Sequence, residues 1–538
     1  MRSVSRHAFE SFENKERAGW QGACGVEAHR PGCGHDEQSA GVPTSTSAAG
    51  RDYREDIDWL RAIAVLAVVA FHFEMPGVWG GFVGVDIFFV ISGYLIGGII
   101  QTELRTGNFS FARFYERRVR RLLPALYVMV GLTAIPSLYY LLPSERTEFF
   151  QSVAAVVTFT SNFFFWFQTG YFDHAAVEKP LLHTWSLAVE EQFYLALPLL
   201  LWATARLAGL RRAAIPVLLA VLTAASFAFS VWLMRHEGSA SAFFMSPPRA
   251  WEFLVGSLIA MQGFPVLRSG LARNCARGAS LVLLATPIFA LRQGPGFPGV
   301  NALAPCLGAA LFIWSGIGVP TRSRSPYSPF HIVRFFGQIS YSLYLWHWPL
   351  FTFVRFSKSS LVLDAFDKIA LFAVTVAISY LSWRFIEKPF RERTLAPTRS
   401  TAFAMAMAAS IVLIVGGVSG AMFVKGSGAA DRVVQRLESY GHYKFEPVYR
   451  FGHCFSPPSG TFDDECLKVV PGKFNVLLWG DSLAAHYFHG LSNRLDPRSN
   501  NILQATQAAC MPTFEAAAQF LAVCRRAASQ MDEFFRPL

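Results

Sequence analysis

Long apolar runs recur along almost the whole chain and constrain its fold more than any other feature. A run of about 16 to 23 apolar residues suits an α-helix that crosses the hydrocarbon core of a bilayer, which is about 30 Å thick. Only 16% of the side chains in the 538 residues are charged and 52% are hydrophobic, so most of the chain belongs in a membrane. We predict eleven spans: 59–75, 81–101, 122–142, 185–205, 213–234, 249–263, 278–293, 301–318, 335–355, 363–385 and 402–424.

The basic residues indicate how these spans are oriented. They form short clusters between apolar runs, as in cytoplasmic loops, so the net charge of +11 does not point to nucleic-acid binding. With eleven crossings all these clusters fall on one side, which places the N-terminus in the cytoplasm and the chain beyond 425 outside it. A twelfth apolar run, 153–167, holds Asn162 among aromatic residues, and we interpret it as re-entrant or interfacial.

The first 50 residues differ from the rest in composition. They are rich in Gly, Ser and charged residues and lack the apolar core of a signal peptide, which predicts a disordered cytoplasmic leader. Cys24, His29, Cys33 and His35 lie within it, but their spacing fits no standard zinc finger. We therefore predict no metal site there.

Arg61, His72 and Asp86 are ionisable residues within the first two predicted spans. Arg61 and His72 are eleven residues apart, which on a helix is three turns plus about 20°, so both side chains share one face about 16 Å apart. Asp86 opens the next apolar run. Ionisable groups at membrane depth are costly and indicate a functional site by default, although Arg61 alone would also suit an anchor at the cytoplasmic surface.

Further ionisable residues lie at the starts and ends of other predicted spans. Aromatic belts at the membrane surface explain the tryptophans and tyrosines beside them, but not two adjacent glutamates entering an apolar helix. With His72 and Asp86 they could build a buried acid-base site in which a histidine takes a hydroxyl proton and a carboxylate orients the imidazole. The candidates are His183, Glu190, Glu191, Arg249, Glu252 and His347.

An ordered set of motifs resembles the integral-membrane acyltransferase 3 family over about residues 54–395. Any one motif would be weak, but their order is specific. They are the spacing of Arg61 and His72, "GGFVGVDIFFVISGYLI", "RFYERRVRRLLPAL", "LLHTWSLAVEEQFY", "RAWEFLVG", "SYSLYLWHWP" and "WRFIEKPFR".

This resemblance implies a function and roles for particular residues. It implies transfer of an acyl group, with acetyl the simplest, from cytoplasmic acyl-CoA to a hydroxyl of an extracytoplasmic glycan such as lipopolysaccharide O-antigen or exopolysaccharide. The protein would lie in the bacterial inner membrane, in contact with lipid, and need no metal. Arg61 and His72 would be the paired essential residues, with His72 handling the proton or the acyl group. The phosphates of coenzyme A would be held by Arg113, Arg117, Arg118 and Arg121.

The C-terminal tail contains a second candidate for a catalytic residue. After the span at 402–424 and a linker at 425–473, the sequence "FNVLLWGDSLAAHYFHGL" predicts a strand, a Gly-Asp-Ser turn and a helix that begins at Ser482. This resembles the start of an SGNH-type esterase domain. No Asp-x-x-His follows Ser482, so we expect 474–538 to be an incomplete α/β domain with Ser482 a vestigial nucleophile. Four cysteines, Cys454, Cys466, Cys510 and Cys524, predict two disulfides of open pairing.

Two other functions fit the same observations. Eleven spans with intramembrane charges would also suit a transporter or flippase of a surface-glycan precursor, although no internal repeat is visible in the sequence. An inactive paralogue with a truncated tail is the other alternative.

Overall fold

The structure is a computed structural model that describes most of the chain from residue 54 onward. The leader predicted for residues 1–50 and Cys524 lie outside the described residues. These are 54–168, 179–207, 213–236, 239–261, 264–292, 296–319, 330–358, 363–426, 445–457, 460–508, 510 and 529–535.

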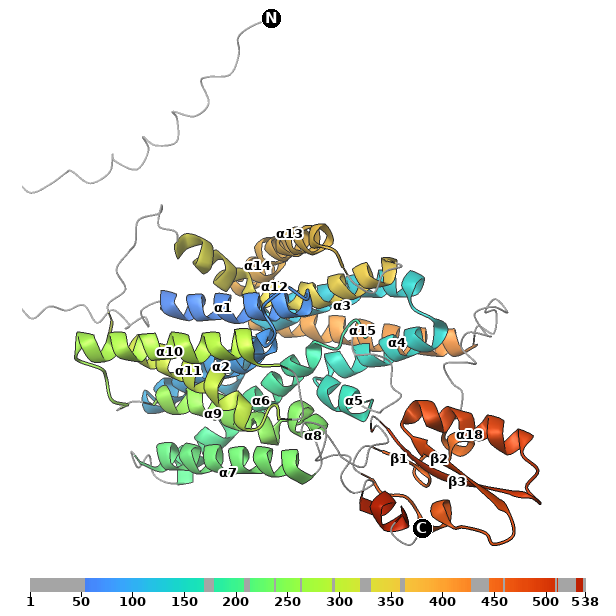
Figure 1. Ribbon diagram of the computed structural model, residues 1–538. Coiled ribbons are helices and arrows are strands. Elements are labelled where there is room, and N and C mark those ends of the chain that lie inside the picture. The colour runs from blue at the N-terminus through green and yellow to red at the C-terminus, as the bar shows by residue number, and fades with distance from the viewer. Residues whose placement is uncertain are drawn as a thin grey trace, which may run out of the picture. The chain divides into compact units, whose positions relative to one another are not determined.

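Helices dominate the described residues between 54 and 426 (Figure 1). The α-helices are α1 Glu55–His72, α2 Gly84–Arg105, α3 Phe111–Tyr140, α4 Pro143–Val157, α5 Ser161–Phe167, α6 Thr184–Leu207, α7 Ala214–His236, α8 Ser239–Phe244, α9 Ala250–Ile259, α10 Gly270–Ala290, α11 Leu303–Ser315, α12 Phe330–Ser357, α13 Ala365–Ser382, α14 Lys388–Arg391 and α15 Arg399–Gly426. Short 3-10 turns are η1 Gly81–Val83, η3 Pro247–Arg249 and η4 Val300–Ala302, and the π-helix η5 covers Trp383–Glu387.

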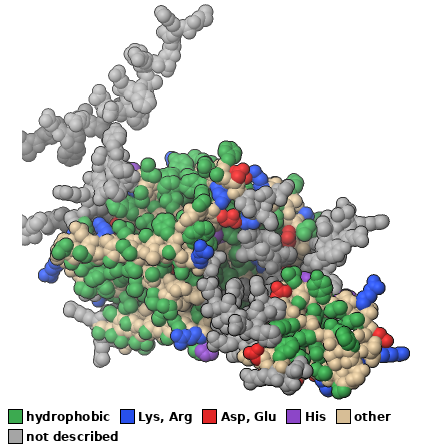
Figure 2. Space-filling model, viewed as in Figure 1, with side chains coloured by type: hydrophobic (Ala, Val, Ile, Leu, Met, Phe, Trp, Pro, Cys, Tyr) green, Lys and Arg blue, Asp and Glu red, His purple; other side chains and the backbone are tan. Residues whose placement is uncertain are grey.

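Each of the eleven predicted spans contains one of these helices, and the visible face of the bundle is largely hydrophobic (Figure 2). By length and composition, five helices in the described part of the chain could cross a membrane alone. They are Gly81–Arg105, Phe111–Tyr140, Ala214–His236, Ala365–Arg391 and Arg399–Val424. The mostly helical membrane architecture is as expected, while the number of crossings stays a prediction.

Two of the predicted spans form helices that are too short to cross alone. At 1.5 Å per residue, the 10 residues of α9 and the 13 residues of α11 reach about 15 and 20 Å, less than the hydrocarbon core. Both pack against α2. Glycines allow α2 and α9 to touch: a Cβ on Gly93 would lie 1.8 Å from the carbonyl oxygen of Phe253, and one on Gly256 2.0 Å from that of Val90.

The twelfth apolar run is interrupted, and its re-entrant or interfacial character stays a prediction. Helix α4 ends at Val157 and α5 begins at Ser161. Asn162 is fully buried, and its side-chain amide donates a hydrogen bond to the carbonyl of Phe244 at 3.1 Å. Buried backbone polar groups must find such partners, so an interrupted helix is tolerated where side chains supply them.

The tail forms a small parallel sheet. Its elements are α17 Phe445–Tyr449, β1 Phe455–Ser456, the turn η6 Asp464–Leu467, β2 Phe474–Gly480, α18 Ser482–Arg494 and β3 Asn500–Gln507, with strand order β1-β3-β2. Helix α18 is the crossover between parallel strands β2 and β3. The predicted strand, Gly-Asp-Ser turn and helix are therefore confirmed. One disulfide joins Cys454 to Cys466, and Cys510 is also disulfide-bonded.

Candidate functional site

A cavity of about 410 Å³ lies where α1 ends and α2 begins. We call it the histidine cavity. His72 is the last residue of α1 and Asp86 lies in the first turn of α2, so the short connection between these helices brings both to one end of the bundle. The lining residues used below are His72, Asp86, His183, Trp185, Arg249 and Tyr344.

A second histidine fixes the ring of His72. His347 Nδ1 lies 2.6 Å from the backbone carbonyl oxygen of Tyr344, which can only accept, so Nδ1 carries the proton of the neutral ring. The lone pair of His347 is then on Nε2, 2.9 Å from His72 Nδ1. His72 therefore donates from Nδ1 and keeps its own lone pair on Nε2, which is the atom that can accept a proton.

Two further rings enclose this pair. The indole of Trp348 meets the ring of His72 edge-on, with centroids 4.7 Å apart. The ring of His183 lies 5.8 Å from that of His347, and neither of its nitrogens has a hydrogen-bond partner among the described residues. His72, His183 and His347, which come from three segments far apart in sequence, are thus brought together.

Asp86 pairs with an arginine rather than with His72. Arg249 Nη2 donates to Asp86 Oδ1 at 2.9 Å, and Arg249 Nε lies 3.1 Å from Glu252 Oε1; all three side chains are almost fully buried. The expectation that a carboxylate orients His72 is wrong for Asp86, because His347 occupies that position. Asp86 instead offsets the positive charge of the Arg249 guanidinium.

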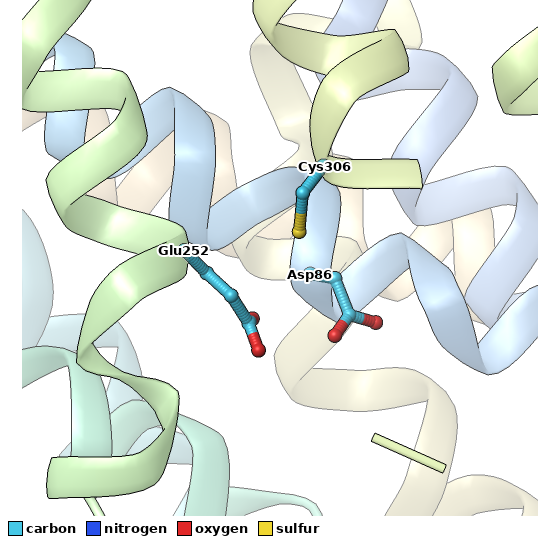
Figure 3. Close-up of side chains that lie close together, drawn as sticks. All are labelled: Asp86, Glu252 and Cys306. Carbon is cyan, nitrogen blue, oxygen red and sulfur yellow. The ribbon is translucent and has the colours of Figure 1, made fainter. Parts of the chain in front are cut away.

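The same cluster includes three atoms spaced as metal ligands could be. The ligand atoms of Asp86, Glu252 and Cys306 lie within 4.8 Å of one another, and Figure 3 shows the two carboxylates turned toward each other with the thiol nearby. Arg249 already contacts both carboxylates, so its guanidinium supplies the positive charge that a metal would otherwise bring. These residues fit an arginine-bridged carboxylate pair better than a metal centre.

A second, smaller cavity of about 70 Å³ contains arginines instead of histidines. We call it the arginine cavity. Arg61 reaches it from α1, and Arg118 and Arg121 from α3. The Nε atoms of Arg118 and Arg121 have no hydrogen-bond partner among the described residues. Arg61 Nη1 lies 3.6 Å from Oδ1 of Asp58, which is one turn earlier on the same helix.

Glu190 belongs to the arginine cavity and not to the histidines. It accepts hydrogen bonds from the hydroxyls of Ser92 and Tyr194. The guanidinium of Arg118 lies over the ring of Tyr194, with its Cζ atom 5.5 Å from the ring centroid. Glu191 is not among the residues that line either cavity. The single acid-base site expected from the sequence is therefore divided in two. Ser92 and Tyr194 were missed, although Tyr194 lies four residues after Glu190 on the same helix face.

The remaining basic residues of α3 lie elsewhere. Arg113 is exposed, and Arg117 forms an ion pair with Glu103 at 2.8 Å. Arg120 is buried and fully bonded: its Nε donates to Glu116, and its other nitrogens donate to the carbonyls of Ala396 and Thr398. Of the four arginines expected to bind coenzyme A, the structure brings only Arg118 and Arg121 into the cavity.

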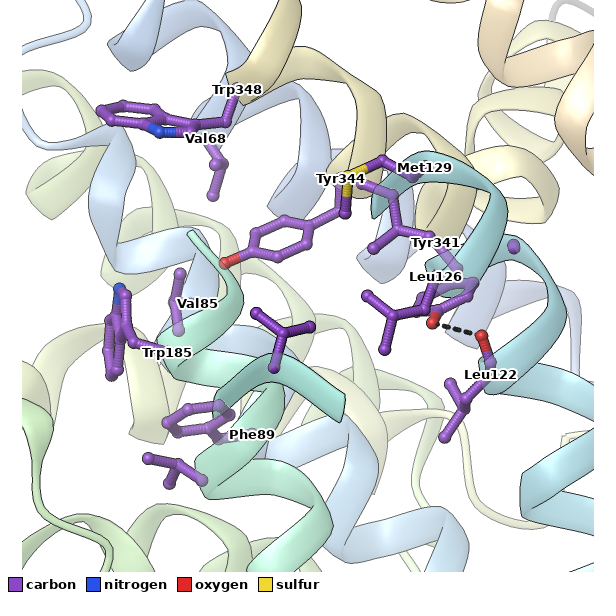
Figure 4. Close-up of a cluster of buried hydrophobic side chains, with 14 of the residues drawn as sticks. Val68, Val85, Phe89, Leu122, Leu126, Met129, Trp185, Tyr341, Tyr344 and Trp348 are labelled. Carbon is purple, nitrogen blue, oxygen red and sulfur yellow. Dashed lines mark hydrogen bonds between the residues drawn. The ribbon is translucent and has the colours of Figure 1, made fainter. Parts of the chain in front are cut away.

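Two side chains line both cavities: Val85 and Tyr344. Figure 4 shows them in one buried cluster with Phe89 and Trp185. The Tyr344 hydroxyl lies 2.5 Å from the Ser186 hydroxyl and 3.0 Å from the carbonyl oxygen of His183. Val85 and Tyr344 therefore form a partition between the two cavities that is one side chain thick.

In the tail, the Gly-Asp-Ser turn holds Ser482 at the start of α18. Asp481 Oδ1 accepts hydrogen bonds from the backbone amides of Leu483 and Ala484, which caps the helix. His453 and Asp463 form a pair at 2.8 Å next to β1, but β3 separates β1 from β2, so these strands are about 10 Å apart. The pair therefore does not complete a triad with Ser482.

Comparisons with known proteins agree with both parts of the chain. Residues 54–384 match the family described as an acyltransferase domain, and residues 452–536 match the SGNH domain that is fused to such domains. BcsY of Komagataeibacter xylinus, named as a membrane-bound transacylase, is 32% identical over 368 residues, 68% of this chain and 90% of that protein.

Two O-acetyltransferases are also similar. Peptidoglycan O-acetyltransferase OatA of Listeria monocytogenes is 32% identical over 363 residues, 64% of this chain and 57% of that protein. O-acetyltransferase OatA of Staphylococcus aureus is 28% identical over 380 residues, 67% of this chain and 62% of that protein. The chain thus spans about three fifths of each OatA protein, and no solved structure matches it significantly. The chain belongs to the acyltransferase 3 family and is an acyltransferase with membrane helices and a fused SGNH domain.

Proposed function

We propose that this enzyme moves an acyl group, with acetyl the simplest, from cytoplasmic acyl-CoA to a glycan hydroxyl on the far side of a bacterial inner membrane. The observation that carries the proposal is the division of the site. A histidine with a defined basic nitrogen lines one cavity, three arginines line the other, and only Val85 and Tyr344 border both.

The arginine cavity would hold the donor. Guanidinium groups bind phosphates through parallel hydrogen bonds, and the free Nε atoms of Arg118 and Arg121 are donors for them. Arg61 adds a third positive charge from α1. A thioester arm that extends from these phosphates past Tyr344 would place the acyl carbonyl in the histidine cavity.

The histidine cavity would perform the transfer. The acceptor hydroxyl gives its proton to His72 Nε2 while its oxygen attacks the acyl carbonyl carbon. When the tetrahedral intermediate collapses, the C–S bond breaks and the leaving thiolate takes the proton from His72. His347 supports both steps, because its Nε2 accepts the Nδ1 proton of His72 and holds the ring in one tautomer.

The acceptor class and the orientation are part of the same proposal. A relative is named for O-acetylation of peptidoglycan, so a cell-surface polysaccharide is the acceptor we infer here. By the positive-inside rule, the arginine-rich start of α3, which includes Arg113, would face the cytoplasm. The disulfide between Cys454 and Cys466 supports a tail outside it, since disulfides persist in oxidising compartments.

Radiolabelled acetyl-CoA tests the proposal in inverted membrane vesicles that contain the enzyme and polysaccharide extracted from the expressing cells. We expect alkali-labile label, the signature of an ester, to accumulate on polysaccharide inside the vesicles. His72→Ala vesicles with equal amounts of inserted protein should leave it unlabelled. Absence of label with the unaltered enzyme, or equal labelling with His72→Ala, would refute the proposal.

A further inference from the structure

Arg249 is held in a fixed orientation inside the protein. It precedes α9, and its side chain is 1% exposed. Its Nη2 is bonded to Asp86 on α2, and its Nε contacts Glu252 one turn later on α9. One hydrogen bond to Asp86 and one ion-pair contact with Glu252 therefore hold the guanidinium group in place.

One nitrogen of this guanidinium has neither a hydrogen bond nor an ion-pair contact among the described residues. Arg249 Nη1 is buried and has no hydrogen-bond partner among the described residues, and Arg249 lines the histidine cavity together with His72. Leaving a buried charged donor unpaired destabilises a fold, so such a group in a native protein calls for a functional explanation.

Arg120 shows that this chain can satisfy a buried arginine when the role is structural. Arg120 is 3% exposed, yet its guanidinium donates to Glu116 and to the carbonyls of Ala396 and Thr398. It joins α3 to the segment before α15. The unpaired donor occurs at the arginine that borders the histidine cavity, not at the one that holds helices together.

Aromatic rings surround the guanidinium of Arg249 and keep water away from it. Its Cζ atom lies 5.3 to 5.8 Å from the centroids of four rings, those of Phe89, Trp185, Phe243 and Phe297. Rings at this distance attract a cation through their faces. In such an apolar environment, a fixed donor interacts more strongly with developing charge than it would in water.

We infer that Arg249 Nη1 donates a hydrogen bond to the carbonyl oxygen of the acyl group during transfer, and so acts as a catalytic residue. The inference rests on the function proposed for His72. As the acceptor oxygen forms its bond to the carbonyl carbon, the π electrons move onto the carbonyl oxygen, and they return when the C–S bond breaks. Arg249 stays protonated throughout and stabilises the oxyanion only while it exists.

The charge balance favours a carbonyl over a permanent anion as the partner. Asp86 and Glu252 already offset the guanidinium charge, so an anionic ligand would gain little net attraction in the resting enzyme. A neutral carbonyl fits this site and gains most when its oxygen becomes negative. An interaction made mainly in the transition state raises kcat rather than lowering KM.

The test replaces Arg249 in the full-length enzyme, reconstituted in proteoliposomes with acetyl-CoA and the extracted polysaccharide. Arg249→Lys keeps a charge but loses the planar group, and we expect kcat to fall about 10²- to 10³-fold, as for loss of one oxyanion donor. KM for acetyl-CoA should change little. In Arg249→Ala, added methylguanidinium should restore part of the lost rate, because it can occupy the vacated space.

Arg120→Ala is the matched control. It removes an equally buried guanidinium that lines neither the histidine cavity nor the arginine cavity. It should therefore lower the unfolding temperature, leave kcat per folded molecule unchanged and show no rescue by methylguanidinium. The inference is overturned if Arg249→Lys keeps its kcat, or if the loss in both Arg249 variants follows the folded fraction and is not rescued. A full rate in His72→Ala would instead refute the proposed function.

Discussion

The histidine cavity and the arginine cavity lie in one helical bundle and share the side chains of Val85 and Tyr344, yet their linings differ in kind. In the first, a hydrogen bond joins the rings of His72 and His347, and the Arg249 guanidinium is already ion-paired with Asp86 and Glu252. In the second, the Nε atoms of two arginines have no hydrogen-bond partner in the part of the chain that the structure describes. The first is suited to moving a proton and the second to holding an anion.

This difference shows how one bundle separates binding from chemistry. Arg61 and His72 belong to the same helix, about 16 Å apart along its axis, and each lines a different cavity. Helix α6 repeats the arrangement, since His183 just before it lines the histidine cavity and Glu190 two turns later lines the arginine cavity. Single helices thus fix the spacing of the two cavities.

The largest effect should come from removing the base of the histidine cavity. His72→Ala leaves the arginine cavity intact, so donor binding should persist while transfer falls by about 10²- to 10⁴-fold or more, the usual contribution of a general base. Initial rates of ester formation and equilibrium binding of acetyl-CoA measure the two effects separately.

An exposed histidine provides the control for that change. His236 lies at the end of α7, where its Nδ1 bonds to the carbonyl of Trp232, and His236→Ala should leave both measurements unchanged. If His72→Ala weakened donor binding as strongly as transfer, the two cavities would not have separate roles.

The converse change should affect binding first. Arg118→Ala combined with Arg121→Ala removes two donors from the arginine cavity, and each hydrogen bond to a charged group is worth about 1.5 to 3 kcal/mol. We therefore expect the Kd for acetyl-CoA to rise by about tenfold or more for each arginine. Added salt should weaken binding to the unaltered enzyme in the same direction.

Arg113→Ala is the control on the same helix. Arg113 is exposed and outside the cavity, so the Kd should stay within about twofold of its original value. An equal loss in Arg113→Ala would mean that the whole basic surface of α3, and not the cavity, binds the donor.

The sequence predicted the helices and the shared face of Arg61 and His72 because both depend on local periodicity. Apolar runs dictate where helices form, and a spacing of eleven residues fixes the relative direction of two side chains on any helix. The turn before Ser482 was predictable for the same reason, since Gly480 and Asp481 define it locally.

The division into two cavities could not be predicted in that way. His183 and Glu190 are seven residues apart and share a helix face, so their positions in sequence fit one site as well as two. The partition depends on Tyr344, which comes from α12, more than 150 residues later in the chain. The tautomer of His72 likewise depends on a backbone carbonyl of α12. The ion pair of Asp86 depends on Arg249, which lies in the segment before α9.

A smaller effect is expected from changing Tyr344, which lies between the two cavities. Tyr344→Phe keeps the ring between the cavities but removes the hydroxyl that contacts Ser186 and the His183 carbonyl. Losing such bonds costs about 1 kcal/mol, so transfer should slow by about fivefold with donor binding unchanged. A second variant, Tyr344→Ala, removes the ring and opens the partition between the cavities. We expect its rate with butyryl-CoA, relative to acetyl-CoA, to be higher than that of the unaltered enzyme. Identical acyl preference in Tyr344→Ala would show that Tyr344 does not limit passage.

The smallest effect is expected in the tail, where Ser482 begins α18. Its nearest described imidazole in sequence, that of His486, packs at a tilt against the ring of Tyr449, with centroids 4.8 Å apart. The His453–Asp463 pair lies beyond β3. The described residues place no base beside Ser482, and a serine hydroxyl without a base is a weak nucleophile, so Ser482→Ala should change acyl transfer by less than about twofold. Asp481→Ala is the matched control, because loss of the helix cap should destabilise the tail by about 1 kcal/mol. If Ser482→Ala abolished ester formation while Asp481→Ala did not, the hydroxyl itself would be required, and the histidine cavity would supply only part of the reaction.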